Sequence, residues 1–394
     1  MQGEKAQWRI VILDDLQDEL LAKSVSFLSS FVPEGGDPVW SAKGFKWKLQ
    51  ENPAGPGFML CVVLGDDVVG TNSITLKRVW YGGRELLAGE AGDIYVSPKV
   101  RPTKRARSEP AEGPEPRSAK QAYIEKSLSG KLRHEDTVRA LKRGVDLIYG
   151  TPNQAAMPGW LRLGYGVHPV EQTSLIRPTA KTLASARGLR LLFDNPVGRV
   201  LLALLAGAER CVESVHFWFW ALVGKVKGYQ IEELEGPTED LDTLWEKCKD
   251  QTPFSLIRDS AYFRHRFFEN PLGTYRVFRT RKNGDICGVL VTRTRRVSSA
   301  KKYCYIADWL LESTHTGLYP VMLAHAIHRN YAADVGGFVT WTTELLPYLR
   351  VFRMFGFVRS SAKVPVIFYP TDIGKELLDD GIVMDFTLAS SDNI

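Results

Sequence analysis

The sequence predicts an α/β (α+β) protein made of two tandem units, each with a central mixed, mostly antiparallel sheet flanked by helices. Three observations support this prediction. The chain has 394 residues, more than one ordinary hydrophobic core accommodates. One pattern of helix, turn and hairpin occurs twice along the chain. The stretch from Asp93 to Tyr165 reads as a strand, a basic turn, a helix and a second strand.

The composition is that of an ordinary globular protein, with 44% apolar and 24% charged residues. The net charge of +6 is spread over scattered lysines and arginines, which argues against nucleic acid as the partner. The five cysteines never occur at CxxC spacing, so we expect reduced thiols and no metal site. Acidic residues interrupt the apolar pattern of the N-terminal region, so no signal peptide is predicted and a cytoplasmic location is expected.

The first copy of the repeated pattern begins with a helix over Asp15 to Phe31, where leucine and valine recur at helical spacing. A short helix follows and is broken at Asn52-Pro53. Two apolar runs joined by Gly65-Asp66-Asp67 then predict a β-hairpin.

The same order of residues recurs later in the chain. Asn52 matches Asn270 and Gly70 matches Gly288, in both cases 218 residues apart. Because one separation holds through helix, turn and hairpin, the sequence predicts two copies of one α/β unit.

The first copy is longer than the second. The glycines that close the copies, Gly164 and Gly356, are only 192 residues apart, which leaves 26 extra residues in the first copy. We place them at Arg101 to Lys126, a polar segment rich in proline and charge. It is either a lid over a bound cosubstrate or a disordered spacer.

We predict three regions: an N-terminal domain over 1–178, a helical connector over 179–249 and a C-terminal domain over 250–394. The connector contains the most apolar run of the chain, Val200 to Val223. Charged residues and a histidine divide this run into pieces shorter than a bilayer span, so we predict a core or inter-domain helix. Peripheral contact with a membrane surface is the alternative, favoured by the aromatic cluster Phe217 to Trp220.

The basic turn before the helix suits a phosphate group. Small side chains at its centre allow the backbone N–H groups to approach an anion, and two lysines supply positive charge. The predicted phosphate-binding residues are Lys126, Ser127, Leu128, Ser129, Gly130 and Lys131.

These parts together resemble the GNAT acyltransferases. The residues that carry the resemblance are Val96-Ser97-Pro98 at the strand end, the turn Lys126 to Leu132, and then Asn153, Ala156, Trp160, Gly164 and Tyr165. The duplication is similar to that of two-domain GNAT proteins that acylate amino sugars. The resemblance implies acyl-CoA or acetyl-CoA as cosubstrate, held at the basic turn, beside Asn153, and at the backbone of Tyr95 and Val96.

Acyl transfer to an amine needs a neutral amine, a polarised thioester carbonyl and a route for one proton. Glu90 and Asp93 are the candidate bases. Glu90 shares strand parity with Val96 and points to the same side if no bulge intervenes. Alternatively, Gly89 to Gly92 form a turn and Glu90 is solvated.

The candidate acid needs a separate choice. Many GNAT proteins carry a tyrosine where this chain has Trp160, which we interpret as a core residue. We therefore take Tyr165 as the candidate acid, with Tyr149 or water as alternatives.

The second copy lacks basic residues beside its turn and lacks an equivalent of Asn153. We therefore predict that it has lost cosubstrate binding and forms a wall of the acceptor cleft, with Asp308, Trp309 and His315 as lining residues.

The predicted function is transfer of an acetyl or short hydroxyacyl group from acyl-CoA to the amine of a dTDP- or UDP-linked amino sugar. One alternative is acylation of a peptide, protein or other amine, or a Fem-like aminoacyl transfer from tRNA. The other is a non-catalytic scaffold of two degenerate units.

Overall fold

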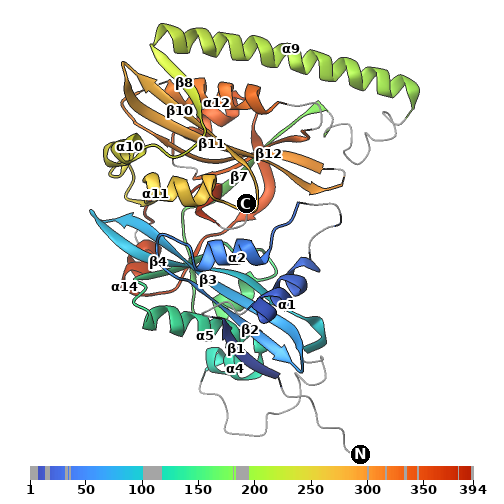
Figure 1. The fold of residues 1–394 in the computed structure, drawn as a ribbon, viewed down its shortest axis with the longest axis vertical. Coiled ribbons are helices and arrows are strands. Elements are labelled where there is room, and N and C mark those ends of the chain that lie inside the picture. Colours follow the sequence, from blue (N-terminus) through green and yellow to red (C-terminus); the bar gives the residue numbers. More distant parts are fainter. Residues whose placement is uncertain are drawn as a thin grey trace, which may run out of the picture. The chain divides into compact units, whose positions relative to one another are not determined.

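The computed structural model describes residues 8–13, 18–31, 34, 37–100, 118–180, 182, 195–299, 301–315, 317–331, 335–343, 346–379 and 381–391. Residues 101–117 of the predicted insertion lie outside this part. The chain divides into two compact units (Figure 1). Unit 1 comprises Met1–Val32, Pro38–Glu171 and Val364–Ile382, and unit 2 comprises Pro33–Asp37, Gln172–Lys363 and Val383–Ile394. Each unit has a mixed sheet flanked by helices, so the predicted fold class is confirmed.

Unit 1 has the sheet order β1-β2-β3-β4-β5-β15-β6, in which the β4–β5 pair is parallel and the other neighbouring pairs are antiparallel. Its strands are β1 (Trp8–Leu13), β2 (Phe58–Leu64), β3 (Asp67–Tyr81), β4 (Arg84–Val96), β5 (Leu147–Gly150), β6 (Gly166–Val167) and β15 (Ile367–Phe368). Its helices are α1 (Asp18–Ser29), α2 (Ala42–Leu49), η1 (Pro98–Val100), α4 (Ala119–Lys126), α5 (Leu128–Lys142), α6 (Met157–Arg162) and α14 (Asp372–Asp379).

The alternation of side chains along β2 gives this sheet an apolar core on each face. Met59 and Cys61 pack with Leu21 and Leu28 of α1. Leu60 and its neighbours on the other face pack with residues of α5. The predicted first helix and hairpin are therefore present as α1 and β2–β3, and the catalytic candidates on β4 lie between two helical layers.

Unit 2 has the order β14-β7-β13-β12-β11-β10-β8, with β12 and β13 parallel. The strands of this sheet are β7 (Gln172–Pro178), β8 (Tyr229–Leu234), β10 (Tyr275–Lys282), β11 (Asp285–Ser298), β12 (Lys301–Leu311), β13 (Gly337–Thr343) and β14 (Val358–Val364). Two further strands of unit 2, β9 (Phe254–Leu256) and β16 (Met384–Asp385), pair with each other in parallel outside this order. Its helices are α9 (Pro196–Val226), α10 (Asp240–Cys248), α11 (Ser260–Phe263), η2 (Arg264–Phe268), α12 (Leu318–Asn330), α13 (Tyr348–Met354) and η3 (Leu388–Ser390).

Each sheet takes in one strand from the other half of the sequence. β15 lies between β5 and β6 in unit 1, and β7 lies between β13 and β14 in unit 2. Residues 172–178 therefore belong to unit 2 and residues 364–382 to unit 1, a division that differs from the predicted ranges 1–178 and 250–394. The predicted helical connector also contains a strand, β8, which pairs with β10.

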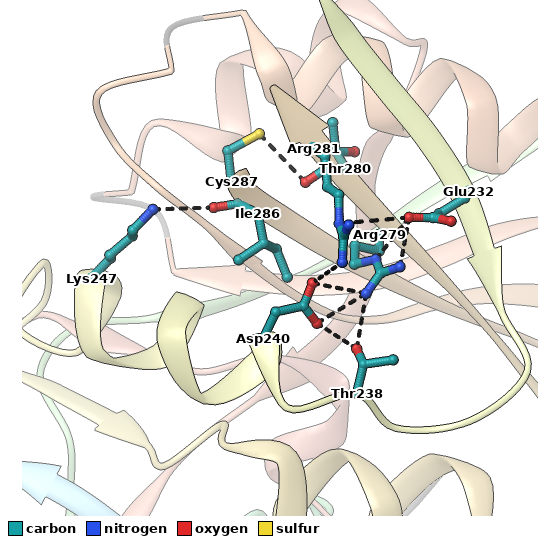
Figure 2. Close-up of polar contacts among 9 residues, drawn as sticks. All are labelled: Glu232, Thr238, Asp240, Lys247, Arg279, Thr280, Arg281, Ile286 and Cys287. Atoms are coloured by element: carbon teal, nitrogen blue, oxygen red, sulfur yellow. Dashed lines mark hydrogen bonds and ion pairs between the residues drawn. The ribbon is translucent and has the colours of Figure 1, made fainter. Parts of the chain in front are cut away.

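Polar contacts attach this part of the connector to the sheet of unit 2 (Figure 2). The Arg279 guanidinium on β10 lies 2.7 Å from Glu232 Oε1 on β8 and 2.8 Å from Asp240 Oδ2 on α10. Arg281 also pairs with Asp240, at 2.6 Å. These contacts join β8 and α10 to the second copy, which therefore begins before the predicted boundary at residue 250.

The repeat is confirmed in atomic detail at the Asn-Pro turns. Asn52 accepts a hydrogen bond from the Ala54 amide at 2.9 Å and donates to the Lys48 carbonyl at 3.2 Å. Asn270 makes the same two bonds, with Leu272 at 2.9 Å and with Arg266 at 3.2 Å. The asparagine side chain closes the helix end in both copies, which explains why this residue type recurs.

Candidate active site

A β-bulge interrupts β4 at the predicted catalytic residues. Ser73 of β3 lies opposite Gly92, and Thr71 lies opposite Tyr95, so two residues of β4, Asp93 and Ile94, occupy the length of one residue of β3. Asp93 has a φ of 51°, in the left-handed region that residues other than glycine rarely adopt. The segment is strand throughout, so the alternative of a turn at Gly89 to Gly92 is wrong.

The bulge lies where β4 separates from β5. These two strands pair in parallel only from Ala88 to Glu90 on β4 and from Leu147 to Tyr149 on β5. Beyond Glu90, β4 continues along β3 but is not paired with β5, among the residues that the structure describes.

Four hydrogen bonds hold Asp93 in its conformation. Its carboxylate accepts from Trp40 Nε1 at 2.8 Å, from Lys48 Nζ at 2.7 Å and from the Ser73 hydroxyl at 2.7 Å. Its backbone carbonyl accepts from the Thr71 hydroxyl at 2.8 Å. Charge-assisted bonds of this length stabilise a strained residue that the local sequence does not favour.

The bulge also determines which way Glu90 points. Glu90 lies opposite Thr75, which is two residues from Ser73 on β3, so Glu90 shares a face with Asp93. Val96 instead packs into the core cluster with Leu128 and Leu132 of α5. Glu90 and Val96 were expected to share a side only if no bulge intervened, and the extra residue of this bulge reverses the alternation between them.

Glu90, Asp93 and Tyr95 thus come together on one face of the sheet. Glu90 is 3% exposed, and its carboxylate lies 3.5 Å from Lys77 Nζ. Tyr95 stacks on Phe31 with ring centroids 4.8 Å apart, and burial raises the pKa of its phenol. Two carboxylates and two ammonium groups, from Lys77 and Lys48, make this cluster neutral, which explains how it remains largely buried.

The predicted phosphate turn is not a turn in the structure. Helix α4 runs to Lys126 and α5 starts at Leu128, with only Ser127 between them. The Ser127 hydroxyl accepts from the Gly130 amide at 3.3 Å, so it caps α5. A Cβ on Gly130 would come within 2.4 Å of the Tyr123 carbonyl, so this glycine serves helix packing. The prediction was wrong because helix signals and phosphate-turn signals share small residues.

Two other residues that were predicted to bind phosphate, Ser129 and Leu128, make contacts inside the protein instead. The Ser129 hydroxyl accepts a hydrogen bond from the Arg133 guanidinium, which also donates to the Tyr123 phenol at 2.8 Å. Leu128 is buried in the α5 core. Lys126 remains exposed, and Lys131 lies 4.8 Å above the Trp8 ring. Of the six residues predicted to bind phosphate, Lys126 and Lys131 are the two that carry a positive charge.

Asn153 and Tyr165 have separate roles after β5. Asn153 is exposed, and its side chain accepts from the Ala156 amide at 2.9 Å, which fixes the turn into α6. Tyr165 lies in the α5 core beside Trp160, which confirms Trp160 as a core residue. The Thr137 hydroxyl donates to the Arg133 carbonyl at 2.8 Å, so the Tyr165 phenol must donate to Thr137, also at 2.8 Å.

Tyr165 is therefore not placed with Glu90 and Asp93. Burial raises the pKa of its phenol, and its proton is already bonded inside the core. Tyr149 is also buried, at 1% exposure. The expectation of Tyr165 as the acid is corrected, because this residue lies between α6 and β6 and packs in the core against Trp160 and Thr137 of α5.

Two of the three predicted acceptor-lining residues of unit 2, Asp308 and Trp309, are corrected. Asp308 is fully buried and accepts from Arg258 Nε at 3.1 Å, from the Tyr262 phenol at 2.7 Å and from the Thr387 hydroxyl at 2.9 Å. Trp309 is 1% exposed and belongs to the core of unit 2. His315 remains partly exposed, 3.8 Å from the Glu312 carboxylate.

The structure reveals an equivalence that the sequence argument missed. Gly70 lies opposite Val96, and its repeat partner Gly288 lies opposite Leu311, so β4 and β12 correspond at a separation of 215 residues. Asp93 therefore corresponds to Asp308, and β12 also has a register shift beside that residue. A shared pattern of a small residue, Asp and then apolar residues was the available signal.

Comparison with solved structures identifies the fold. Saccharomyces cerevisiae N-myristoyltransferase, solved with bound myristoyl-CoA and inhibitors, matches with a TM-score of 0.60 and 12% identity, over 93% of this chain and 82% of that chain. A GCN5-related N-acetyltransferase from Anabaena variabilis matches with a TM-score of 0.55 and 11% identity, over 93% and 74%. The GNAT resemblance is thereby confirmed at the level of the fold. No protein-family model and no curated protein matches the sequence.

Proposed function

We propose that this chain is an N-acyltransferase that transfers an acyl group from acyl-CoA to a primary amine, and that the reaction takes place at the bulge of unit 1. The observation that carries the proposal is the strained, four-bonded Asp93 at the point where β4 leaves β5. Strained residues that the surrounding structure holds in place are concentrated at functional sites. The fold is shared with enzymes whose names state N-acyl transfer.

The two carboxylates of the site have different tasks. All three side-chain bonds to Asp93 come from donors, so this residue is suited to position the bulge rather than to accept a proton from a substrate. Glu90 has the ammonium of Lys77 beside it at 3.5 Å and lies on the same face. We assign Glu90 as the general base and Asp93 as a positioning residue.

The proposed reaction is a direct attack of the amine on the thioester. The amine nitrogen forms a bond to the thioester carbonyl carbon, the C–S bond breaks, and the electron pair leaves with the CoA sulfur. Glu90 accepts the proton that the amine loses. A thiolate with an ordinary pKa near ~8.5 leaves without prior protonation, so no tyrosine acid is required. The backbone near Tyr95 and Val96 is proposed to bind the thioester carbonyl.

The proposed acyl-CoA site extends from this bulge toward α5. Lys126 and Lys131 are proposed to meet its phosphates, and Asn153 to lie beside it. One similar structure was solved with myristoyl-CoA, so long acyl chains belong in the test beside acetyl and hydroxyacyl chains.

The proposed acceptor is the amine of a dTDP- or UDP-linked amino sugar. We propose that the reaction takes place in the cytoplasm. The net charge of +6 is complementary to a diphosphate-bearing acceptor. Peptide and protein amines are the second acceptor class, since one similar structure is an N-myristoyltransferase. The site of unit 1 opposes the scaffold alternative, because a scaffold has no need of a strained residue.

The test is release of free CoA thiol from acetyl-CoA and myristoyl-CoA with a panel of acceptors. The panel contains dTDP- and UDP-amino sugars and peptides with a free N-terminal amine. We expect acceptor-dependent thiol release with one acceptor class. No release with any pair, together with no thermal stabilisation by CoA, would contradict the proposed activity.

A further inference from the structure

Helix α9 presents an apolar face to solvent along its whole length. With 31 residues it spans about 45 Å at 1.5 Å per residue. Val200, Leu204, Cys211, Val215 and Trp218 follow one another at helical spacing on this face, and all of them are exposed. The exposed large apolar residues of α9 are Val197, Val200, Leu201, Leu204, Leu205, Val212, Val215, Trp218, Phe219, Leu222 and Val226.

The opposite face attaches α9 firmly to unit 2. The Phe217 ring stacks on His328 of α12, with centroids 3.9 Å apart and planes at 9°. A Cβ on Gly224 would approach Val321 to 2.8 Å, so the two helices are in close contact there. Because these contacts fix the rotation of α9, its apolar face cannot turn inward without breaking them.

The charges of α9 are sorted between the two faces. Its acids point inward: Glu213 pairs with Arg177, and Glu209 accepts from the Ala180 amide at 2.8 Å. The exposed charged residues of the helix and its C-terminal cap are all basic, namely Arg199, Arg210, Lys225 and Lys227. An apolar stripe bordered by basic residues is complementary to an anionic lipid surface.

A second copy of the chain fits this face less well. In a two-fold contact the same surface meets itself, which would bring the basic border of one α9 close to that of the other. Trp218 and Phe219, 68% and 56% exposed, are residue types suited to the boundary between acyl chains and headgroups. No helix in the described part of the chain is long and apolar enough to cross a membrane.

We propose that α9 docks the protein on the surface of a bilayer that contains anionic phospholipids, lying in the plane of the interface. This proposal is independent of the proposed acyl transfer, because it rests on residues of α9 and not on the bulge of unit 1. It develops the alternative of peripheral membrane contact, which the aromatic cluster Phe217 to Trp220 favoured in the sequence.

The test is cosedimentation of the full chain with vesicles. We expect binding to vesicles of phosphatidylcholine with phosphatidylglycerol, at least tenfold weaker binding to phosphatidylcholine alone, and loss of that difference at high salt. The variant Val215→Glu/Trp218→Glu should lose vesicle binding. Leu161→Glu is the matched control, because Leu161 is 44% exposed on α6, and this variant should bind like the unmodified chain.

A fluorophore on Cys211 gives a second readout. Cys211 is the exposed cysteine of the five, and it lies on the apolar face. We expect blue-shifted emission of an environment-sensitive label when anionic vesicles are added. Vesicle binding that Val215→Glu/Trp218→Glu leaves unchanged would overturn the proposal. So would a dimer that this variant dissociates and that shows no vesicle binding.

Discussion

The two units contain an aspartate at equivalent positions, counted from the paired glycines Gly70 and Gly288, and use it differently. In unit 1, Asp93 has a left-handed backbone, a side chain that is 10% exposed, and donors from Trp40, Lys48 and Ser73. In unit 2, the equivalent Asp308 is fully buried beside Arg258. Trp40 and Arg258 are themselves 218 residues apart, so the donor at one repeated position changed from an indole to a guanidinium.

We interpret Asp93 as part of a reaction site in unit 1 and Asp308 as part of a structural ion pair in unit 2. Arg258 is completely buried and lies 2.8 Å from a second carboxylate, Asp385. Its guanidinium pairs with two buried acids, Asp308 and Asp385, so the part of unit 2 that corresponds to the bulge lies inside the core. In unit 1 the corresponding acid is paired with a lysine and has a second ion pair, Lys77–Glu90, on the same face. In the described structure the positive φ of Asp93 has no counterpart at Asp308, and the second acid beside Asp308, Asp385, is paired with Arg258.

The largest effect is expected when the buried cation of unit 2 is removed. Arg258→Met leaves two carboxylates inside unit 2 without their guanidinium, and should lower the free energy of unfolding by about 3–5 kcal/mol. Urea unfolding measures the loss. Arg78→Met is the control, since Arg78 pairs with Glu85 at the surface and should cost less than about 1 kcal/mol. An equal loss of unfolding free energy in the two variants would contradict the structural role assigned to Arg258.

Loss of the candidate base should abolish most of the activity of unit 1. Glu90→Gln keeps the size of the side chain but cannot accept the amine proton, and should lower kcat by about 10²–10³-fold with KM little changed. Steady-state thiol release with the best acceptor measures both constants. Glu85→Gln on the same strand should retain activity. A Glu90→Gln enzyme with unchanged kcat would remove Glu90 from the mechanism.

The repeated aspartates should respond in opposite ways to one substitution. Asp93→Asn tolerates the left-handed backbone but weakens the bond to Lys48, and should lower kcat about tenfold with a small change in Tm. Asp308→Asn should lower Tm far more than kcat, since it removes a charge that Arg258 needs. Paired measurement of Tm and kcat on both variants checks this. Parallel losses in both variants would mean that the two positions have one role.

The smallest effect concerns a buried acid of unit 1, Asp136 on α5. In the described structure neither carboxylate oxygen makes a hydrogen bond of normal geometry, and burial raises the pKa of this acid well above the ordinary 3.8, against an opposing interaction with the Asn72 side chain. The folded protein therefore keeps a proton that the unfolded chain releases, so this contribution to stability is complete below pH 3.8 and falls as pH rises. Asp136→Asn should stabilise the protein at neutral pH by on the order of 1 kcal/mol.

Melting curves over a pH series measure this effect. The gain from Asp136→Asn should shrink as the pH approaches 4. Glu135→Gln, a change at the partly exposed neighbour on the same helix, should show a much smaller pH dependence. A gain that is constant with pH would contradict the assignment of a protonated Asp136.

The fold was predictable because its signals are local and repeated. The Asn-Pro turns at Asn52 and Asn270 make the same hydrogen bonds in both copies, so the sequence pattern had a direct physical cause. The exchanged strands β7 and β15 were not predictable from pattern alone. A short apolar strand fits either sheet equally well, and only the tertiary arrangement decides which one takes it.

The site was predictable in part. Glu90, Asp93 and Tyr95 do share a face. The regular alternation of side chains would have put Glu90 on the side of Val96, and the bulge reverses that alternation. A bulge depends on contacts from Trp40, Lys48 and Ser73, which lie far from it in sequence. The role of Tyr165 was misassigned for a related reason, since its burial depends on Thr137 of α5.

The central claim is that unit 1, and not unit 2, holds the reacting acyl group. A structure with a non-reactive acyl-CoA analogue, whose thioester is replaced by a ketone, tests it most directly. We expect the ketone oxygen at the backbone of Tyr95 and Val96, with Glu90 on the side from which an amine would attack. An analogue seated instead at Leu310 and Leu311, the equivalent residues on β12, would contradict the claim.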